Sequence, residues 1–380
     1  MKLDIWHNIL WARYKAGVFT ALAKLAQEHG DDLTVFQIAE TESNRVALSG
    51  VDLDLHRYPV VNLFKGAYSD ISKWRLYWET TRRVATTTAD VTIVAGFERP
   101  EYWLQLLILT LRRRKKAVFC DSTLADNPQY RLKTLVKKAV FSLCDGAFCY
   151  GERSRAFLLH HGMDPARIHI RRQAAALPAD YDATRIPARR KEMAAPSSAP
   201  VFVYIGRLSP EKRIDTLIRA FAKVLEVQPA AILRIVGGGP QNDALRTLAK
   251  ELGLDANIDF AGSKAGQALF DCYLSASAFV LPSSSEPWGL VVNEALHFGC
   301  PVIVSDRCGC VPELVEKSDC GQAFTCDDED ELGAAMLAVP RDYADPEETA
   351  ARCLKKIASF TPEVAANGIL AGARKIAAGA

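Results

Sequence analysis

Short apolar runs and longer amphipathic stretches alternate along the chain. An apolar run bounded by polar or turn-forming residues predicts a buried strand, and apolar residues every three or four positions predict a helix. In the first half we expect strands at residues 2–6, 33–38, 91–95, 117–120, 147–150 and 168–170, and helices at 17–30, 102–111, 132–143 and 154–161. This alternation predicts an α/β fold with a parallel, doubly wound sheet.

The same alternation returns in the second half. Strands are expected at 201–205, 231–236, 258–260, 278–281 and 302–305, and helices at 214–227, 242–252 and 267–276, around Glu294, near 312 and in the tail 359–375. Residues 178–200 are rich in proline and charge and have no apolar period, which is typical of a linker. We therefore expect Rossmann-like domains at 1–178 and 201–355, a linker at 179–200 and a closing segment at 356–380, a division that suits 380 residues.

Composition favours an ordinary globular protein of the cytoplasm. Charged residues make up 24% and hydrophobic residues 49% of the chain, and no apolar run approaches the ~20 residues that span a bilayer. Charge within Met1–His7 argues against a secretory signal. The 10 cysteines are scattered, without a Cys-x-x-Cys pair or histidines at zinc spacing, so we expect free thiols and no metal site.

Charge is divided unevenly between the halves. Residues 1–190 hold 29 Lys or Arg and 20 Asp or Glu, whereas the remainder holds 18 and 25. A basic first half suggests an anionic partner, which is a membrane surface, a phosphate-bearing acceptor or a nucleic acid. The apolar stretch Trp103–Leu111 ends in five cations, Arg112–Lys116. These cations either contact an anionic leaflet or follow the C-terminus of a buried helix.

Two glycine-bearing turns follow strands of the second half. Gly206-Arg-Leu-Ser-Pro-Glu-Lys212 offers N–H groups at a helix start together with Arg207 and Lys212, which suits a diphosphate, although a solvated turn explains it equally well. In Val236-Gly-Gly-Gly-Pro240 the glycines permit a close approach to a ligand or form a plain tight turn. Neither turn has the spacing of a Walker A or dinucleotide-binding loop, so a nicotinamide cofactor is not expected.

Glu286 and Glu294 lie eight residues apart, at the end of the strand 278–281 and on the helix behind it. Ligands of open α/β sheets bind at this edge. The pair is compatible with an acid/base pair, with two acceptors for sugar and ribose hydroxyls, or with two solvent-facing side chains. Pro287-Trp-Gly-Leu290 between them favours a ligand cradle, because Trp and Gly at such a turn give a rigid wall and exposed N–H groups.

Four motifs together resemble one enzyme family. In order and spacing they are similar to retaining glycosyltransferases of the GT-B fold, family 4 (glycosyl transferases group 1): Gly206-Arg-Leu-Ser-x-Glu-Lys212, Val236-Gly-Gly-Gly-Pro240, Leu281-Pro-Ser-x-x-Glu286-x-Trp-Gly-Leu-Val-x-x-Glu294-Ala-Leu and Gly299-x-Pro-Val-Ile-Val-Ser-Asp306. The likeness covers about residues 200–315, and the first half matches only in the order of its elements. It implies two Rossmann-like domains facing across a cleft, with a C-terminal helix that crosses back to the N-terminal domain.

The resemblance implies roles for individual residues of these motifs. Arg207 and Lys212 would stabilise the donor diphosphate, Glu286 would lie beside the donor sugar, and Glu294 would accept hydrogen bonds from the ribose. Further donor contacts are implied for Gly206, Gly238, Pro287, Trp288, Gly289 and Leu290. The family usually needs neither metal nor cofactor. It needs no dedicated base if the leaving phosphate oxygen takes the acceptor's proton on the same face of the sugar.

The first domain departs from the family pattern. Where the family often has a glycine pair after the first strand, this chain has Lys15-Ala-Gly17, so Gly17 with Arg13 or Lys15 is a candidate to contact donor phosphates or an acidic acceptor. After the strand 117–120 the family has a histidine that contacts the donor sugar, and here Asp121 takes that place. Asp121 is therefore a candidate catalytic residue, or else it caps a helix.

The function implied by the resemblance is transfer of a sugar from a nucleoside diphosphate sugar, with UDP favoured by family frequency. The N-terminal domain would bind a glycan or lipid-linked acceptor in cell-surface polysaccharide or lipopolysaccharide synthesis, in the cytoplasm or peripherally on the plasma membrane, with no nucleic-acid partner. The alternatives are a nucleotide-sugar epimerase or a phosphorylase on the same fold, and a degenerate scaffold that binds polysaccharide or a protein partner.

Overall fold

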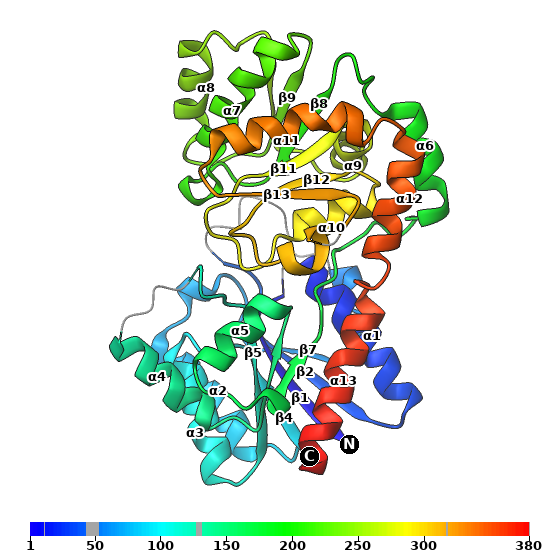
Figure 1. The fold of residues 1–380 in the computed structure, drawn as a ribbon. Coiled ribbons are helices and arrows are strands. Elements are labelled where there is room, and N and C mark those ends of the chain that lie inside the picture. Colours follow the sequence, from blue (N-terminus) through cyan, green and yellow to red (C-terminus); the bar gives the residue numbers. More distant parts are fainter. Residues whose placement is uncertain (11, 43–52, 127–130, 317, 380) are drawn as a thin grey trace. The chain divides into compact units, whose positions relative to one another are not determined.

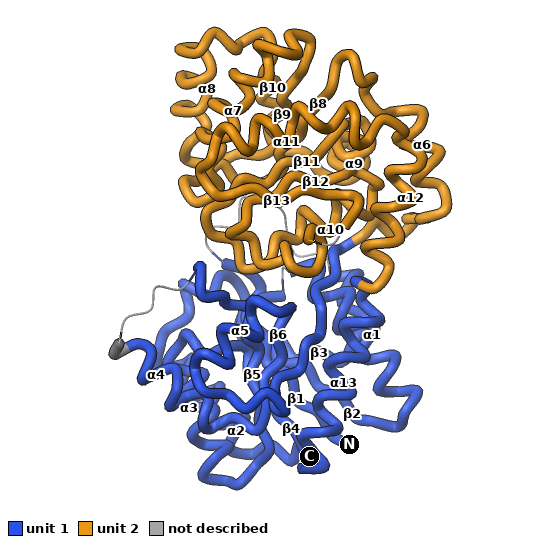
Figure 2. The backbone as a smooth tube through the Cα atoms, viewed as in Figure 1, with its two compact units in different colours: residues 1–176, 360–380 blue, residues 177–359 orange. Residues whose placement is uncertain are grey.

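The computed structural model describes the chain except for residues 11, 43–52, 127–130, 317 and 380. The chain divides into two compact units, residues 1–176 with 360–380 and residues 177–359 (Figures 1 and 2). Each unit is built around one sheet of parallel strands, which confirms the predicted pair of Rossmann-like domains. No helix in the described part is both long enough and apolar enough to cross a membrane.

The first unit contains a seven-stranded sheet in the order β3-β2-β1-β4-β5-β6-β7. Its strands are β1 (Lys2–Ile9), β2 (Asp32–Ala39), β3 (Val60–Asn62), β4 (Val91–Val94), β5 (Lys115–Cys120), β6 (Gly146–Cys149) and β7 (Ile168–Ile170). Its helices are α1 (Arg13–Glu28), α2 (Lys73–Thr86), α3 (Pro100–Leu111), α4 (Arg131–Ser142), α5 (Glu152–His160) and α13 (Pro362–Ala378).

Helices cover both faces of this sheet. Apolar side chains of α2 to α5, among them Leu76, Leu106 and Phe157, pack into one core. Phe19 of α1 and Ile369 of α13 belong to the core on the opposite face. The C-terminal helix therefore completes the first unit, although 360–380 is the last segment of the chain.

The second unit contains a six-stranded sheet in the order β10-β9-β8-β11-β12-β13. Its strands are β8 (Val201–Ile205), β9 (Ile232–Val236), β10 (Ile258–Gly262), β11 (Ala278–Leu281), β12 (Val302–Ser305) and β13 (Gly321–Phe324). Its helices are α6 (Ile186–Met193), α7 (Ile214–Val227), α8 (Asn242–Glu251), α9 (Gln267–Ser275), α10 (Leu290–His297), α11 (Glu329–Asp342) and α12 (Pro346–Ile357). The helix expected near 312 is a single π-helical turn, Val311–Val315.

The segment 179–200 is more structured than the expected linker, because it contains α6. Arg190 of α6 is buried, and its Nη1 donates to three carbonyl oxygens at the end of α9, those of Tyr273 (3.0 Å), Leu274 (2.7 Å) and Ala276 (2.6 Å). The last carbonyls of a helix need such donors. One buried cation therefore fixes a segment whose composition is that of a linker.

Candidate functional site

Each sheet reverses its strand order at one place, between β1 and β4 in the first unit and between β8 and β11 in the second. Ligands of parallel α/β sheets bind beyond the carboxyl ends of the strands at such a reversal. In the second unit the loop after β8 carries Arg207 and Lys212, and the loop after β11 carries Glu286. The fold therefore brings residues of two separate motifs to one sheet edge.

Lys212 and Glu286 form an ion pair between these two loops. Their side chains are only 14% and 18% exposed, so solvent screens the pair less than a surface pair. The backbone reinforces the contact, because the Ser284 N–H donates to the carbonyl oxygen of Glu211 at 2.9 Å. The cation and the carboxylate that the motifs predicted are thus held together.

Arg207 lies in a more open position than Lys212. Its side chain is 61% exposed, and its Nη2 contacts Glu211 Oε1 at 3.3 Å. An exposed ion pair of this kind contributes only ~0–1 kcal/mol. The guanidinium can therefore leave Glu211 at little cost when a phosphate offers a stronger, bidentate partner.

Glycines let the loops after β8 and β9 pack backbone to backbone. The Gly206 N–H donates to Val236 O, and the Leu208 N–H donates to Gly238 O, both at 3.0 Å. Gly237 has a φ of +138°, and a side chain there would come within 1.9 Å of the Gly206 oxygen. Only glycine fits such a position. Loop packing is therefore a sufficient reason for the glycine run, and donor contacts of Gly206 and Gly238 stay predictions.

The loop that leads into α10 is held from behind by residues 308–310. The Gly309 N–H donates to Glu286 O at 2.8 Å, and the Cys310 N–H donates to Trp288 O at 3.0 Å. Gly289 has a φ of +103° at the start of α10, a left-handed conformation that suits glycine. These contacts fix the backbone of the predicted donor segment Pro287–Leu290.

Trp288 does not form the ligand-facing wall that its position in the motif suggested. Its indole is buried, and the Nε1–H donates to Asn293 Oδ1 at 2.8 Å within α10. The ring therefore braces the loop from inside. The donor contacts predicted for Trp288, Gly289 and Leu290 fall to their backbone groups and stay predictions.

Glu294 lies in the first turns of α10, where its side chain is largely but not completely buried. Its Oε2 accepts a hydrogen bond from the Tyr273 hydroxyl at 2.9 Å. Burial raises the pKa of the Glu294 carboxyl to about 7, and the Tyr273 hydrogen bond opposes that rise. Further hydroxyl donors would favour the carboxylate form. The side chain is thus suited to a ligand that offers hydroxyl groups.

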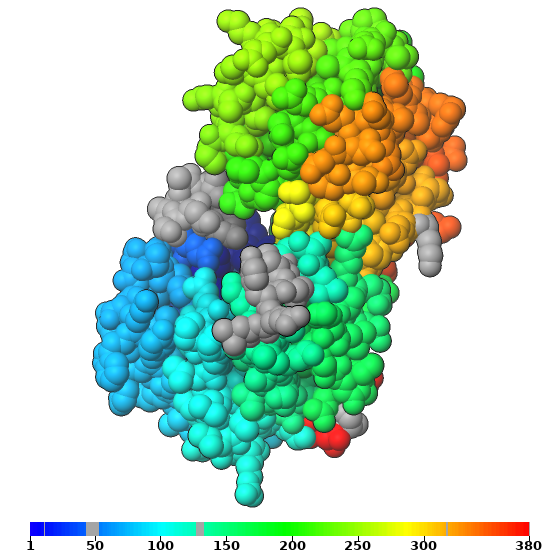
Figure 3. All heavy atoms as spheres, turned by 60° about the vertical axis from the view of Figure 1, so that its left-hand side comes forward, coloured from blue at the N-terminus to red at the C-terminus, as the bar shows by residue number. Residues whose placement is uncertain are grey.

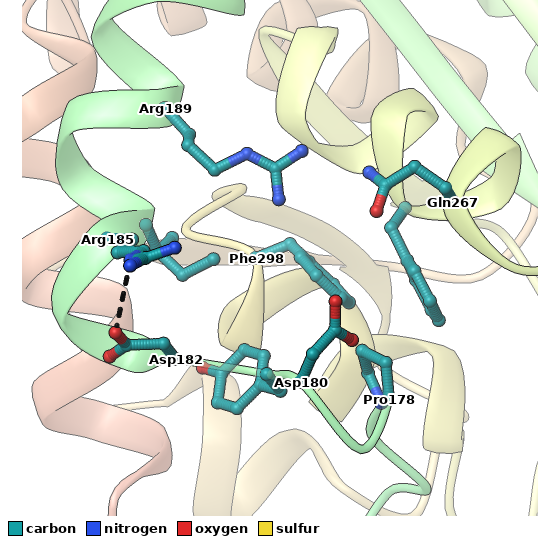
Figure 4. Close-up of a pocket in the computed structure, with 10 residues that line it drawn as sticks. Pro178, Asp180, Asp182, Arg185, Arg189, Gln267 and Phe298 are labelled. Atoms are coloured by element: carbon teal, nitrogen blue, oxygen red, sulfur yellow. Dashed lines mark ion pairs between the residues drawn. The ribbon is translucent and has the colours of Figure 1, made fainter.

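A cavity of about 230 Å³ lies in the second unit beside the C-terminal end of α10 (Figure 4). Figure 4 shows the guanidinium of Arg189 and the amide of Gln267 reaching toward the space between them, with Phe298 below. Phe298 stacks on Tyr273 with 6.0 Å between ring centroids. Since Tyr273 also binds Glu294, packing at the cavity wall helps to place the carboxylate.

In the first unit, Asp121 follows β5 and pairs with Arg171, which follows β7. Arg171 is 1% exposed, and its Nη2 lies 3.3 Å from Asp121 Oδ1. The Asp121 side chain is 40% exposed, so one side of the carboxylate is held and the other is open. The alternative of a helix cap is wrong, because no helix begins before α4 in the described residues after Asp121. Arg171 itself was not predicted.

Lys15 is a second buried cation at this edge. Its Nζ lies 5.2 Å from the ring centres of both Phe119 and Tyr150, and the Arg171 guanidinium lies over the same rings at 4.9 and 4.2 Å. Burial and then the charge of Arg171 lower the pKa of Lys15 to about 7, against the opposing effect of Asp121. Two buried cations thus lie near one carboxylate, which pairs with Arg171, and an added anion would be stabilised here.

Gly17 lies inside α1 and not in the expected loop. The helix begins at Arg13, so Lys15 also belongs to its first turns. The residues before Gly17 form helices readily, and one glycine costs a helix only ~1 kcal/mol, so the pattern starts earlier than the glycine suggests. A side chain at position 17 would touch Pro362 of α13 at 3.7 Å. A contact of Gly17 with the donor stays a prediction, without the phosphate-binding loop that motivated it.

Comparisons with known proteins agree with this arrangement. Residues 186–357 match the family model described as Glycosyl transferases group 1. The D-inositol 3-phosphate glycosyltransferase of Corynebacterium efficiens is 29% identical over 290 residues, which cover 69% of this chain and 68% of that protein. Further curated relatives of the same name match over about half of their own length.

Solved structures extend the likeness to the whole chain. Anabaena HepE in complex with UDP has a TM-score of 0.70 at 18% identity, with 98% of both chains covered. The lipopolysaccharide outer core galactosyltransferase WaaB has a TM-score of 0.71 at 14% identity, with 98% of this chain and 99% of that chain covered. The two parallel-sheet units and these matches show that the chain has the GT-B fold of glycosyltransferases, and that its residues 186–357 match the glycosyl transferases group 1 family.

Proposed function

We propose that the chain transfers a sugar from a nucleoside diphosphate sugar, with UDP favoured, to an acceptor hydroxyl with retention and without a metal. The observation that carries this proposal is the largely buried Lys212–Glu286 ion pair at the sheet reversal of the second unit. A diphosphate that enters there meets a positioned cation, and the attached sugar meets a carboxylate. Anabaena HepE, which has a similar fold, forms a complex with UDP and glucose.

The proposed roles follow from charge and position. Arg207 and Lys212 stabilise the negative charge on the departing diphosphate, the step in which preorganised charges accelerate a reaction most. Glu294 accepts hydrogen bonds from the ribose, and Glu286 accepts them from the donor sugar. The bond between the sugar's anomeric carbon and the phosphate breaks while the bond to the acceptor oxygen forms. The acceptor's proton passes to the leaving phosphate oxygen on the same face, so no separate base is needed.

For the acceptor we propose a glycan or lipid-linked molecule of cell-surface polysaccharide or lipopolysaccharide synthesis, bound by the first unit at the cytoplasmic face of the plasma membrane. A phosphate-bearing polyol is the second candidate. Two observations favour it, the buried cations Lys15 and Arg171 and the curated relatives named for D-inositol 3-phosphate. A phosphate at this edge would relieve the repulsion between the two cations.

A donor and acceptor panel tests the proposal. The full chain is incubated with UDP- and GDP-sugars and with either a lipid-linked glycan or an inositol phosphate, and products are followed by proton NMR of the anomeric signal. We expect acceptor-dependent release of nucleoside diphosphate and a product with the donor's anomeric configuration. An inverted product would contradict retention. An epimerised donor, or a sugar phosphate formed from inorganic phosphate, would favour the epimerase or phosphorylase alternative.

A further inference from the structure

One surface of the first unit exposes many large apolar side chains. Of the 16 large apolar residues that are exposed in the described part of the chain, eight lie on α2, α3 and α4. Exposed apolar residues scattered singly are ordinary, whereas a contiguous group marks an interaction site. The outward side of these three helices, here called the α2–α4 face, is therefore a candidate interaction surface.

On α2 the exposed residues lie opposite the buried ones. Leu76, Thr80 and Val84 are buried against the core, and Trp74 and Trp78 are 75% and 60% exposed. At 3.6 residues per turn, each Trp lies about 200° around the helix from the buried residue two positions later. Both indoles therefore point away from the sheet and contribute little to the core.

The same outward side of α3 and α4 is also apolar. Leu104, Leu107 and Leu111 recur at helical spacing on α3, and Leu111 is 74% exposed. Leu135 on α4 is 63% exposed. Helix α2 packs against α3, and all three helices contribute to the same core over one face of the sheet, so their outward sides face the same way. Figure 3 turns this side of the first unit forward, from light blue through cyan to blue-green.

The segments that form this face are rich in cations. Residues 73–86, 100–116 and 131–142 hold 13 Lys or Arg and two acidic residues. Part of this charge is neutralised, because Glu79 pairs with Arg82 at 3.0 Å and Arg83 at 2.6 Å, and Asp145 pairs with Lys115 and Lys116. The exposed Arg112 and Arg113 lie outside these pairs. Exposed tryptophans among basic residues are typical of surfaces that lie in a membrane interface.

We propose that the α2–α4 face docks on an anionic lipid surface, with Trp74, Trp78 and Leu111 in the interfacial layer and Arg112–Arg114 against the headgroups. Anionic headgroups match both features of the face, since they attract its cations and cover an apolar layer. The proposed function places the enzyme at a membrane, and this proposal names the surface that would contact it. It rests on the proposed function only for the membrane location, because docking requires neither a donor nor an acceptor.

Flotation of the full chain with vesicles tests the proposal. We expect binding to vesicles of phosphatidylcholine with phosphatidylglycerol, little binding to phosphatidylcholine alone, and a loss of at least about tenfold when salt rises from ~0.1 M to ~0.5 M. Replacing both indoles (Trp74→Ser with Trp78→Ser) should lower binding at least about tenfold. The matched control is Val227→Ser, which removes another exposed apolar side chain, on α7.

A second variant separates charge from apolar contact. Arg112→Gln with Arg114→Gln should weaken binding to anionic vesicles severalfold, whereas Lys250→Gln on α8 should not. UDP affinity of each variant, measured by calorimetry, reports whether it is folded and keeps donor binding distinct from membrane binding. The proposal is overturned if the double Trp variant binds vesicles as wild type does. It is also overturned if the wild type does not bind anionic vesicles. That result would include the case in which Trp74 and Trp78 instead hold two copies of the chain together.

Discussion

The two units place opposite buried charges at the same edge of similar sheets. In the second unit, burial raises the pKa of the Glu294 carboxyl to about 7. In the first unit, burial lowers the pKa of the Lys15 ammonium to about 7. Burial penalises whichever form is charged, so one physical cause moves an acid and a base to the same pH from opposite sides. The two units therefore differ in the kind of ligand that would favour the charged form: hydroxyl donors for the Glu294 carboxylate, and an anion for the Lys15 ammonium.

The neighbours of these two residues make the difference larger. Glu294 accepts a hydrogen bond from the Tyr273 hydroxyl. In the same unit, the cation Lys212 is already paired with Glu286. Lys15 lies near a second cation, Arg171, and Arg171 is paired with the carboxylate of Asp121. We infer that hydroxyl donors suit the edge of the second unit and that an anion suits the edge of the first.

The largest effect should come from removing the paired cation of the second unit. Lys212→Ala should lower kcat by ~10²–10³, the usual loss when one preorganised group that stabilises developing charge is removed. Release of nucleoside diphosphate measures it. Lys223→Ala is the matched control, because Lys223 lies on α7 and pairs with Asp330 at 2.7 Å outside the predicted site. An unchanged kcat with a raised KM would mean that Lys212 contributes to binding alone.

Nucleotide binding should change the protonation state of Glu294 in the second unit. Ribose hydroxyls favour the ionised form of Glu294, so nucleotide binding near pH 7 should release protons. Calorimetry in buffers of different ionisation enthalpy measures this release, and Glu294→Gln should abolish it while weakening UDP binding about tenfold, as the loss of hydrogen bonds to a charged group implies. Equal release from wild type and variant would exclude Glu294 as the source.

The base of the first unit should behave in the opposite way. A phosphate-bearing acceptor would favour charged Lys15, so its binding near pH 7 should take up protons. Lys15→Met should raise the KM for such an acceptor about tenfold, while Lys24→Met, an exposed lysine of the same helix, should not. An effect on phosphorylated acceptors alone would favour the polyol phosphate over a neutral glycan. No effect on either would separate Lys15 from acceptor binding.

The sequence predicted more of the second unit than of the first. Most strands and helices could be predicted from local patterns of apolar residues. Arg207, Lys212, Glu286 and Glu294 could be predicted because they belong to motifs with fixed spacing. Arg171 could not be found in this way, since it reaches Asp121 across 50 residues of chain. Contacts of that kind depend on strand order, which an apolar pattern does not contain.

The burial of individual side chains also could not be predicted from the motifs. Trp288 looks like a ligand wall in sequence, and its buried indole instead donates a hydrogen bond to Asn293 of α10. Arg190 looks like one more cation of a linker, and it caps α9 from the interior. In each case the residue type suits a surface role, and only the packing of distant segments decides that the side chain points inward.

The smallest effect is on stability, and it has opposite pH dependence in the two units. The pKa of Glu294 is raised from its ordinary 4.5, so its contribution to folding is fully present below pH 4.5 and is lost as pH rises through about 7. The pKa of Lys15 is lowered from 10.5, so its cost is greatest below pH 7 and is relieved as pH rises toward 10.5.

Two neutral variants should therefore change the melting temperature in opposite directions as pH rises. Relative to wild type, Glu294→Gln should gain stability from pH 5 to pH 8, by ~1 kcal/mol after allowance for its partial exposure. Lys15→Met should be favoured most near pH 6 and lose that relative gain by pH 10, because wild-type Lys15 is then neutral as well. Calorimetric melting across this range compares both variants with wild type. Parallel curves for the two variants would mean that the two edges do not hold opposite buried charges.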